Sequence, residues 1–351
     1  MDANMKVIGL GHAITDMVYR ADSDFLGRHG LSAGGMTLVD ADTACALRSA
    51  AETAAATAPA ETATATVTTT EGAVQVSAGG GAANTIGHLA RLGIGAEILV
   101  RVGDDAAGSG FVSEMESLGV RIVGGVETGG VSGQCLVFVS DDGGVIERTM
   151  ATCLGVSQGL LLSAVNDLGW GDAGWLFLEG YLWDSDAGRL AALDALSRAR
   201  GSGVRAALTL SDFGCVERHR DEFLGLLSEF GVFVFGNERE AGALLGVSDT
   251  DGQVKGLREL TGSFALTLGA EGSVVCDGGE VFRATASVVE GVVADVTGAG
   301  DIYAAGYLCG RLRGLGVGES GEMGSRAARE TLGYLGACVG EDFATRVLGL
   351  D

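Results

Sequence analysis

The stretch that decides the fold is DVTGAGDIYAAGYL, residues 295–308. Three small residues, Gly298, Ala299 and Gly300, lead directly into an apolar helical pattern, and Asp301 stands where that helix would begin. A helix N-terminus presents unpaired N–H groups and a partial positive charge, and small residues let an anion approach it closely. Asp301 can therefore cap the first turn, or it can act as general base beside an anion hole for a transferring phosphoryl group.

Around this stretch, apolar strand-like runs alternate with helical patterns. Strands are expected at 6–11, 96–103, 120–126, 174–180, 204–210, 232–236 and 264–269, and helices at 85–93, 110–119, 186–203 and 237–246. Such alternation is typical of an α/β fold with a parallel sheet covered on both faces. Ligands then bind past the carboxyl ends of the strands. Residues 134–150 instead form two apolar runs around Asp-Asp-Gly-Gly, which predicts a β-hairpin.

Composition narrows the classes of function. The chain has 351 residues, of which 47% are hydrophobic, enough for one large α/β domain. Its formal net charge of −23 argues against nucleic acid and anionic membrane surfaces as partners. No window of about 18 residues is apolar throughout, so no membrane span is expected. Residues 50–71 are rich in Ala and Thr and are expected to be a low-complexity surface insertion.

The seven cysteines stand singly, without a C-x-x-C pair. This pattern suggests neither a zinc site nor a disulfide framework and favours reduced thiols in a cytoplasm. The N-terminal segment lacks a basic stretch followed by a long apolar run, so no signal peptide is expected.

A second glycine cluster, SAGGGAANTIGHLARLG (77–93), precedes another predicted helix. One interpretation is an ordinary turn into the helix. The other is a backbone platform for a hydroxylated ligand, with Asn84 both donating and accepting hydrogen bonds. Sequence pattern alone leaves both interpretations open.

Four motifs, taken together and in this order, resemble the ribokinase-like (PfkB) family of carbohydrate and nucleoside kinases. They are GGGAANTIGHLARLG (79–93), GNERE (236–240), TLGAEGS (267–273) and DVTGAGD (295–301). Further segments are similar to the adenosine-kinase-like branch, namely GLGHAITDMV (9–18), GLSAGGMTLVD (30–40), ERTMATCLG (147–155) and LFLEGYLWD (176–184). The resemblance implies one domain over 1–351, built as a three-layer α/β sandwich with a mostly parallel central sheet. It also implies a small β-sheet lid from segments about 12–45 and 131–150.

The resemblance also implies roles for individual residues. The implied catalytic group is Gly298, Ala299, Gly300, Asp301 and, reaching the phosphates, Arg148. The implied substrate group is Asp16, Gly79, Gly80 and Asn84, with His12 as a further candidate. The implied ATP-binding group is Asn237, Glu240, Thr267, Gly269 and Gly272. Glu240 would organise Mg²⁺ largely through water, and Asp295 and Thr297 would supply backbone oxygens to a K⁺ site.

Two positions depart from the pattern of the resemblance. His12 stands where relatives of this branch commonly have Asn. A lone His after a strand is more often structural, but this one lies four residues before Asp16 and could contact substrate. The segment GACVGED (336–342) lacks a proline that is common in relatives, which bears on the cation loop.

The sequence thus predicts an enzyme that transfers the γ-phosphoryl group of ATP to a primary hydroxyl of a nucleoside or sugar. The branch resemblance favours adenosine, and a fructose- or ribose-type sugar kinase is the alternative. A non-catalytic ligand sensor on the same scaffold is a more distant reading, disfavoured by the intact Gly-Ala-Gly-Asp. An NAD-dependent oxidoreductase is another, disfavoured because Ile14 replaces the third glycine of G-x-G-x-x-G. Relatives often pair through the small sheet, which would make a homodimer.

Overall fold

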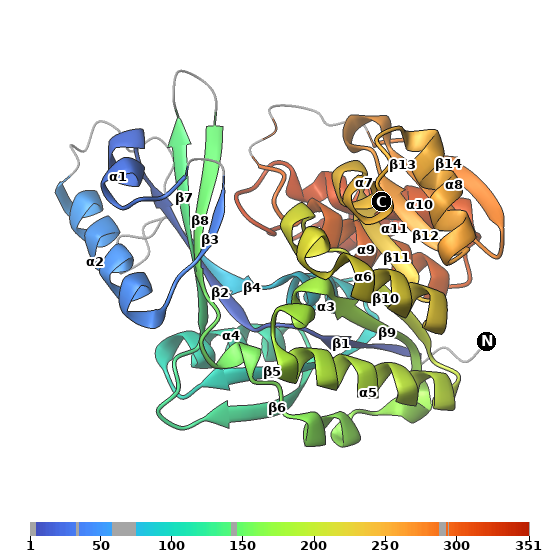
Figure 1. Ribbon diagram of the computed structural model, residues 1–351, viewed down its shortest axis with the longest axis horizontal. Coiled ribbons are helices and arrows are strands. Elements are labelled where there is room, and N and C mark those ends of the chain that lie inside the picture. The colour runs from blue at the N-terminus through green and yellow to red at the C-terminus, as the bar shows by residue number, and fades with distance from the viewer. Residues whose placement is uncertain are drawn as a thin grey trace.

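The larger of two sheets carries the carboxyl-terminal strand ends at which a site is expected. The computed structural model describes residues 5–32, 35–57, 75–141, 146–287, 293 and 295–350. Within them, this sheet has nine strands in the order β14-β13-β12-β11-β10-β9-β1-β5-β6 (Figure 1). The strands are β1 (Lys6–Leu10), β5 (Gly95–Gly103), β6 (Arg121–Glu127), β9 (Ala173–Glu179), β10 (Arg205–Thr209), β11 (Phe233–Asn237), β12 (Phe264–Thr267), β13 (Ser273–Asp277) and β14 (Glu280–Ala284). Every neighbouring pair from β6 to β12 is parallel, and β13 and β14 add an antiparallel edge.

Helices cover both faces of this sheet, because its strands bury alternate residues on opposite sides. In β9, Leu176 and Leu178 face one core and Trp175 and Phe177 face the other. The first core is closed by α5 (Asp186–Ser202), α6 (Phe213–Phe230), α7 (Glu238–Leu245) and α8 (Thr250–Leu260). The second is closed by α3 (Gly81–Arg91), α4 (Ala106–Ser117), α9 (Ala299–Leu312), α10 (Val317–Thr331) and α11 (Phe343–Leu348). The predicted three-layer α/β sandwich is confirmed.

Local signals set where these helices begin and end. The side chain of Ser185 accepts a hydrogen bond from Gly188 N–H at the start of α5, and Asp212 does the same for Cys215 at the start of α6. Such caps stabilise a helix by about 1 kcal/mol each. Gly203 ends α5 with φ 71°, a left-handed conformation that favours glycine.

The second sheet has five strands within the described residues, in the order β3-β8-β7-β2-β4. They are β2 (Ile14–Arg20), β3 (Met36–Leu38), β4 (Gln75–Gly79), β7 (Gly133–Asp141) and β8 (Ile146–Cys153). The predicted hairpin over 134–150 is confirmed as the antiparallel pair β7 and β8. Figure 1 shows this sheet standing beside the larger one, with β2 continuing from β1.

One face of the second sheet is covered by α1 (Ser23–Arg28) and α2 (Ala41–Thr57) (Figure 1). Phe25 and Leu47 from these helices pack with Tyr19 and Phe138 of the sheet in one buried cluster. Of the Ala/Thr-rich stretch predicted as an insertion, residues 50–57 belong to α2, and residues 58–71 lie outside the described part of the chain. Among the described helices, none combines the length and apolar character needed to cross a membrane.

Candidate active site

The stretch quoted first forms an open helix N-terminus at the start of α9. Gly298 is the N-cap with φ 74°, and the first helical bond runs from Ile302 N–H to the Gly298 carbonyl at 2.9 Å. The N–H groups of the first turn, including those of Gly300 and Asp301, therefore have no partner inside the helix. A Cβ on Gly298 would lie 2.4 Å from the Ala337 Cβ, whereas Gly300 borders open space. The backbone is thus exposed where the sequence predicts the anion hole.

The Asp301 side chain is partly buried beside this turn, and hydrogen bonds from α3 hold it. Asn84 Nδ2 donates to Asp301 Oδ2 at 2.9 Å, and the Thr85 hydroxyl donates to the Asp301 carbonyl at 3.1 Å. Burial raises the pKa of Asp301 to about 7; the Asn84 bond lowers it, and Glu179 and Asp16 raise it. A carboxylate with a pKa near neutrality is suited to general-base work.

The absence of side chains at Gly79 and Gly80 lets polar groups approach the start of α3. A Cβ on Gly79 would lie 2.5 Å from Asp16 Oδ2, and one on Gly80 would lie 2.3 Å from the His12 carbonyl. Gly80 also has φ 100°, so both space and conformation require glycine there. Burial raises the pKa of Asp16 to about 7, with Arg148 lowering it and Glu114 raising it. Asp16 thus reaches the start of α3, where Asn84 and Asp301 meet.

A cavity of about 210 Å³ opens beside Asp301. Its polar lining is Thr209, Ser211, Asn237, Glu240, Thr267 and Asp301, with the backbone of Gly298 and Gly300. Of the described residues, no Lys, Arg or His lines it. Two carboxylates that face each other without a basic partner fit a bound divalent cation, and the donors present are the oxygens that Mg²⁺ prefers. The lining therefore fits Mg²⁺.

Asn237 and Glu240 form a capping box at the start of α7. Glu240 N–H donates to Asn237 Oδ1 at 3.0 Å, Asn237 N–H donates to Glu240 Oε2 at 3.0 Å, and Asn237 Nδ2 donates to Glu240 Oε1 at 2.6 Å. Burial raises the pKa of Glu240 to about 7; the Asn237 backbone lowers it, and Asp212 and Asp301 raise it. Both Glu240 oxygens therefore already accept hydrogen bonds from Asn237.

The 267–273 loop follows the next strand. Thr267 pairs in register with Asn237, which places it beside the capping box. Gly269 has φ 57° and Gly272 has φ 94°, and a Cβ on Gly272 would lie 2.1 Å from the Ala284 carbonyl. These glycines shape the turn, but they are not among the residues that line the cavity.

Arg148 joins the second sheet to the loop before α9. Its guanidinium contacts the Asp295 carboxylate and the Thr297 hydroxyl. Asp295, which is 7% exposed, also accepts from Thr297 N–H at 3.1 Å and from Gly336 N–H at 2.6 Å. The side chain of Asp295 therefore connects three separate segments, in addition to the backbone role expected for it.

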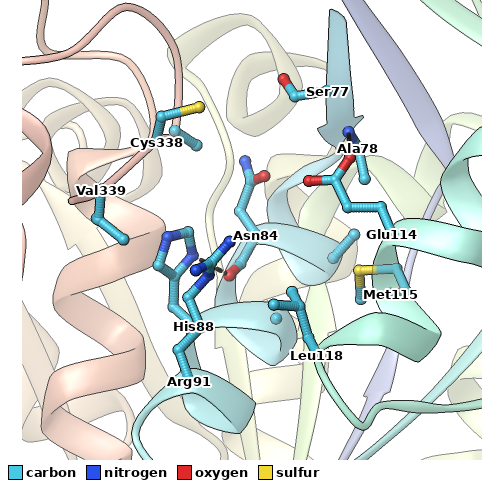
Figure 2. Close-up of a pocket in the computed structure, with 13 residues that line it drawn as sticks. Ser77, Ala78, Asn84, His88, Arg91, Glu114, Met115, Leu118, Cys338 and Val339 are labelled. Atoms are coloured by element: carbon cyan, nitrogen blue, oxygen red, sulfur yellow. Dashed lines mark hydrogen bonds between the residues drawn. The ribbon is translucent and has the colours of Figure 1, made fainter. Parts of the chain in front are cut away.

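A smaller cavity of about 80 Å³ lies between α3, α4, β4 and the 337–339 segment (Figure 2). Figure 2 shows Asn84 above His88, and His88 Nδ1 donates to the Asn84 carbonyl at 2.7 Å. Burial lowers the pKa of His88 to about 4. Glu114 Oε2 accepts from Ala78 N–H at 2.7 Å, next to Gly79. The residues around this cavity support the substrate group, and they do not line the cavity beside Asp301.

Three residues of the site were missed by the sequence analysis. Glu179 ends β9 and is 1% exposed; His12 N–H donates to its Oε1 at 2.7 Å and Ala82 N–H donates to its Oε2 at 2.8 Å. Ser211 has φ 68°, the one positive φ of a non-glycine among the described residues, and accepts from Gly180 N–H at 2.8 Å. Thr209 ends β10 beside it. The available signal was their position at strand ends, where ligands bind.

The structure brings most of the predicted residues to one edge of the sheet. Asp16, Gly79, Gly80, Asn84 and Asp301 adjoin one another, and Asn237, Glu240 and Thr267 line the cavity that Asp301 borders. His12 is 2% exposed, and its Nδ1 lies 2.5 Å from Glu179 Oε1. Its Nε2 is buried without a hydrogen-bond partner in the described part of the chain.

A parallel α/β sandwich with a small second sheet, an open helix N-terminus and a partly buried aspartate beside it define a small-molecule kinase of the ribokinase-like fold. A family model described as "pfkB family carbohydrate kinase" matches residues 50–343, and the chain belongs to this family.

Solved structures and curated relatives agree with this assignment. The adenosine kinase from Sinorhizobium meliloti is 34% identical with a TM-score of 0.86, and the match covers 99% of this chain and 100% of that one. A probable sugar kinase from Rhizobium etli is 30% identical with a TM-score of 0.86, covering 99% of both chains. The fructoselysine 6-kinase of Shigella flexneri is 26% identical over 260 residues, 74% of this chain and 91% of that protein.

Proposed function

We propose that this enzyme transfers the γ-phosphoryl group of ATP to a primary hydroxyl of a nucleoside, with adenosine as the favoured acceptor. The observation that carries the proposal is the hydrogen bond from Asn84 to Asp301 at the open start of α9. It joins the predicted substrate group to the predicted catalytic group at one point. The 34% identity to an adenosine kinase over nearly the whole of both chains supports the choice of acceptor.

In the proposed mechanism, Asp301 accepts the proton of the attacking hydroxyl. Asn84 orients one oxygen of Asp301 and leaves the other for that hydroxyl. The N–H groups of the first turn of α9 stabilise the negative charge that develops on the transferring group. Asp16 and the Gly79–Gly80 backbone orient the acceptor. Mg²⁺, when bound with ATP near Asn237 and Glu240, would offset the charge of the phosphates.

A sugar kinase is the second candidate. The probable sugar kinase from Rhizobium etli is 30% identical over 99% of both chains, and the fructoselysine 6-kinases are more distant. The same catalytic group would serve either acceptor. Each acceptor presents a primary hydroxyl to Asp301.

The proposed lid, cation site and assembly belong to the same proposal. The second sheet would act as a lid on a single domain, with Arg148 contacting Asp295 and Thr297 in the state described. The backbone of Asp295 and Thr297 would contribute to a K⁺ site.

A homodimer would have to use a surface other than the sheet face that α1 and α2 cover. No disulfide joins the seven cysteines, which supports a reducing compartment such as the cytoplasm.

The test is an ADP-release assay over nucleosides and sugars, with ATP and Mg²⁺, in the presence and absence of K⁺. The panel holds adenosine, guanosine, uridine, ribose, fructose and a fructosamine. Adenosine is expected to give the highest kcat/KM, and Asp301→Asn is the blank for each acceptor. Preference for a sugar would select the second candidate, and no ADP release above the blank with any acceptor would refute the kinase.

A further inference from the structure

The smaller cavity, between α3, α4, β4 and the 337–339 segment, differs in charge from the cavity beside Asp301. Its volume is about 80 Å³, and the charged side chains in its lining are Arg91 and Glu114. Figure 2 shows these two side chains reaching the cavity from α3 and α4. The cavity beside Asp301 has carboxylates and, among the described residues, no basic side chain. The smaller cavity is therefore balanced in charge, in a chain whose formal net charge is −23.

Arg91 is a cation without a protein partner. It lies in the last turn of α3, is exposed, and forms no hydrogen bond or ion pair with any residue that the structure describes. Arg101 and Arg121, by contrast, each contact a carboxylate. A guanidinium group binds a carboxylate through two parallel hydrogen bonds. Arg91 therefore offers a binding position for the carboxylate of a ligand.

The opposite charge in the lining, that of Glu114, is only half occupied. Its Oε2 accepts from Ala78 N–H at 2.7 Å, whereas its Oε1 has no partner within the described residues. The hydroxyl of Ser77, one residue before Ala78 on β4, also has no partner in that part of the chain. Carboxylate and hydroxyl oxygens accept hydrogen bonds, so this part of the lining fits a cationic group that donates several of them, such as an ammonium.

The rest of the lining is neutral. His88 is 6% exposed, its Nδ1 donates to the Asn84 carbonyl at 2.7 Å, and burial lowers its pKa to about 4. The ring is therefore uncharged at neutral pH, and its Nε2 is an acceptor. Met115 and Leu118 add apolar surface. A ligand with a short carbon body would find apolar contacts here as well as polar ones.

The volume and the charge balance together define the class of ligand. A cavity needs about 10–15 Å³ for each water molecule that it holds, so about 80 Å³ has room for about five to eight small non-hydrogen atoms. Small α-amino acids fall within this range, whereas nucleosides and hexoses exceed it. A lone anion would face Glu114 and a lone cation would face Arg91, so the lining favours a molecule that carries both charges.

We propose that this cavity binds a small α-amino acid as a zwitterion, with its carboxylate on Arg91 and its ammonium group on Glu114 and Ser77. The inference goes beyond the proposed function and does not depend on it. Asn84 lines the cavity and also donates to Asp301, so a bound amino acid contacts the helix that supports the candidate active site.

The experiment is isothermal titration calorimetry on the full chain, without ATP or a phosphoryl acceptor, with glycine, alanine and serine as probes. We expect saturable binding of glycine with a Kd of about millimolar order, because so small a ligand gains little free energy in total. Acetate and methylammonium each carry one of the two charges, and each should bind about tenfold more weakly or less.

Two variants test the assigned contacts. Arg91→Gln and Glu114→Gln each remove one charge and keep a polar side chain, so each should weaken glycine binding by about tenfold or more. Glu116→Gln is the matched control, because Glu116 lies on the same helix as Glu114, is exposed and does not line the cavity. Its affinity for glycine should equal that of the wild type.

Absence of saturable binding with all three amino acids overturns the proposal. Acetate or methylammonium that binds as tightly as glycine also overturns it, since one charge would then suffice. Wild-type glycine affinity in either Arg91→Gln or Glu114→Gln has the same consequence. Should thermal melts show that Glu114→Gln does not fold, Arg91→Gln carries the test, because Arg91 is exposed and no described contact depends on it. None of these outcomes depends on the acceptor panel, since no phosphoryl transfer is measured.

Discussion

Buried and partly buried carboxylates have opposite electrostatic surroundings at the two edges of the main sheet, meaning here the two ends of its strands. At the edge where β10 begins, Asp277 contacts Arg205 at 2.8 Å and Arg311 at 3.3 Å. Burial alone would raise the pKa of Asp277, but Arg205, Ser263 and Arg311 lower it below its usual range. At the opposite edge, Asp301 and Glu240 have no ion-pair partner among the described residues, and burial raises both pKa values to about 7.

The comparison distinguishes a carboxylate that stabilises the fold, Asp277, from carboxylates that have no basic partner and are available to a ligand, Asp301 and Glu240. A buried carboxylate with basic partners is at its most favourable without any ligand. One without such partners lowers stability until a proton, a cation or a hydrogen-bonding substrate arrives. Strained or unpaired groups of this kind concentrate at functional sites. The comparison therefore predicts opposite responses to the same Asp-to-Asn change at the two edges.

The largest expected effect is on catalysis at the carboxyl edge. Asp301→Asn removes the proton acceptor but keeps the size of the side chain, so kcat should fall by about 10²–10⁴-fold or more. Binding of ATP with Mg²⁺, measured by calorimetry, should persist. A variant that retains near-normal turnover would remove Asp301 from the mechanism.

The second effect concerns the contact between the two sheets. Arg148→Ala removes the guanidinium that contacts Asp295 and Thr297, so kcat/KM should fall by about tenfold to a hundredfold. Arg189→Ala, which breaks exposed pairs with Asp186 and Glu222 on α5 and α6, is the matched control and should have no effect on turnover. Equal kcat/KM in the two variants would show that the Arg148 contact does not matter for catalysis.

The third effect is a gain in stability at the carboxyl edge. The folded chain holds a proton on Asp16 up to a pH of about 7, whereas the unfolded chain loses it near pH 4. Wild-type stability should therefore decrease from pH 4 to 7 on account of this residue, and remain reduced above 7. Asp16→Asn should melt above the wild type at pH 8 and close to it at pH 4, while losing activity. A lower melting temperature than the wild type at pH 8 would contradict the prediction.

The smallest effect is the reverse change at the other edge. The lowered pKa of Asp277 stabilises the fold at neutral pH, and this contribution is lost as the pH falls through the lowered value. Asp277→Asn should reduce the melting temperature at pH 7 by a few degrees, with the deficit shrinking in acid, and turnover of the folded enzyme should not change. An Asp277→Asn chain that melts above the wild type at pH 7 would end the contrast between the edges.

Sequence reasoning identified the residues whose chemistry is carried by local pattern. Asp301 with its glycines and Asn84 lie at helix starts, where small residues mark the position in the sequence. The Asn237–Glu240 pair, which also starts a helix, was expected only from the family resemblance. The parallel sheet followed from continuous apolar runs. The resemblance placed β2 within a lid segment, 12–45, but gave no bounds for the strand, because its Asp and Thr interrupt the apolar run. The pairing of β2 with β4 was not predicted, since β4 is distant in the chain.

The residues that the sequence analysis missed have roles that depend on contacts between segments distant in the chain. Glu179 is a single acidic residue at the end of an apolar strand, and nothing local shows that its oxygens meet His12 and Ala82. Ser211 occupies a left-handed conformation that its sequence does not require. Arg148 was expected to contact the phosphates. Its contact with Asp295 depends on where the second sheet, which carries Arg148, lies relative to the loop before α9. Such roles arise from packing between segments, which spacing along the chain does not encode.

The helices α1 and α2, which cover the outer face of the second sheet, have a consequence for how the enzyme works on dilution. The large side chains of that face are already buried within one polypeptide, so the sheet does not need another copy to be shielded from water. Burial of that face therefore does not depend on protein concentration, whether or not the chain associates through another surface.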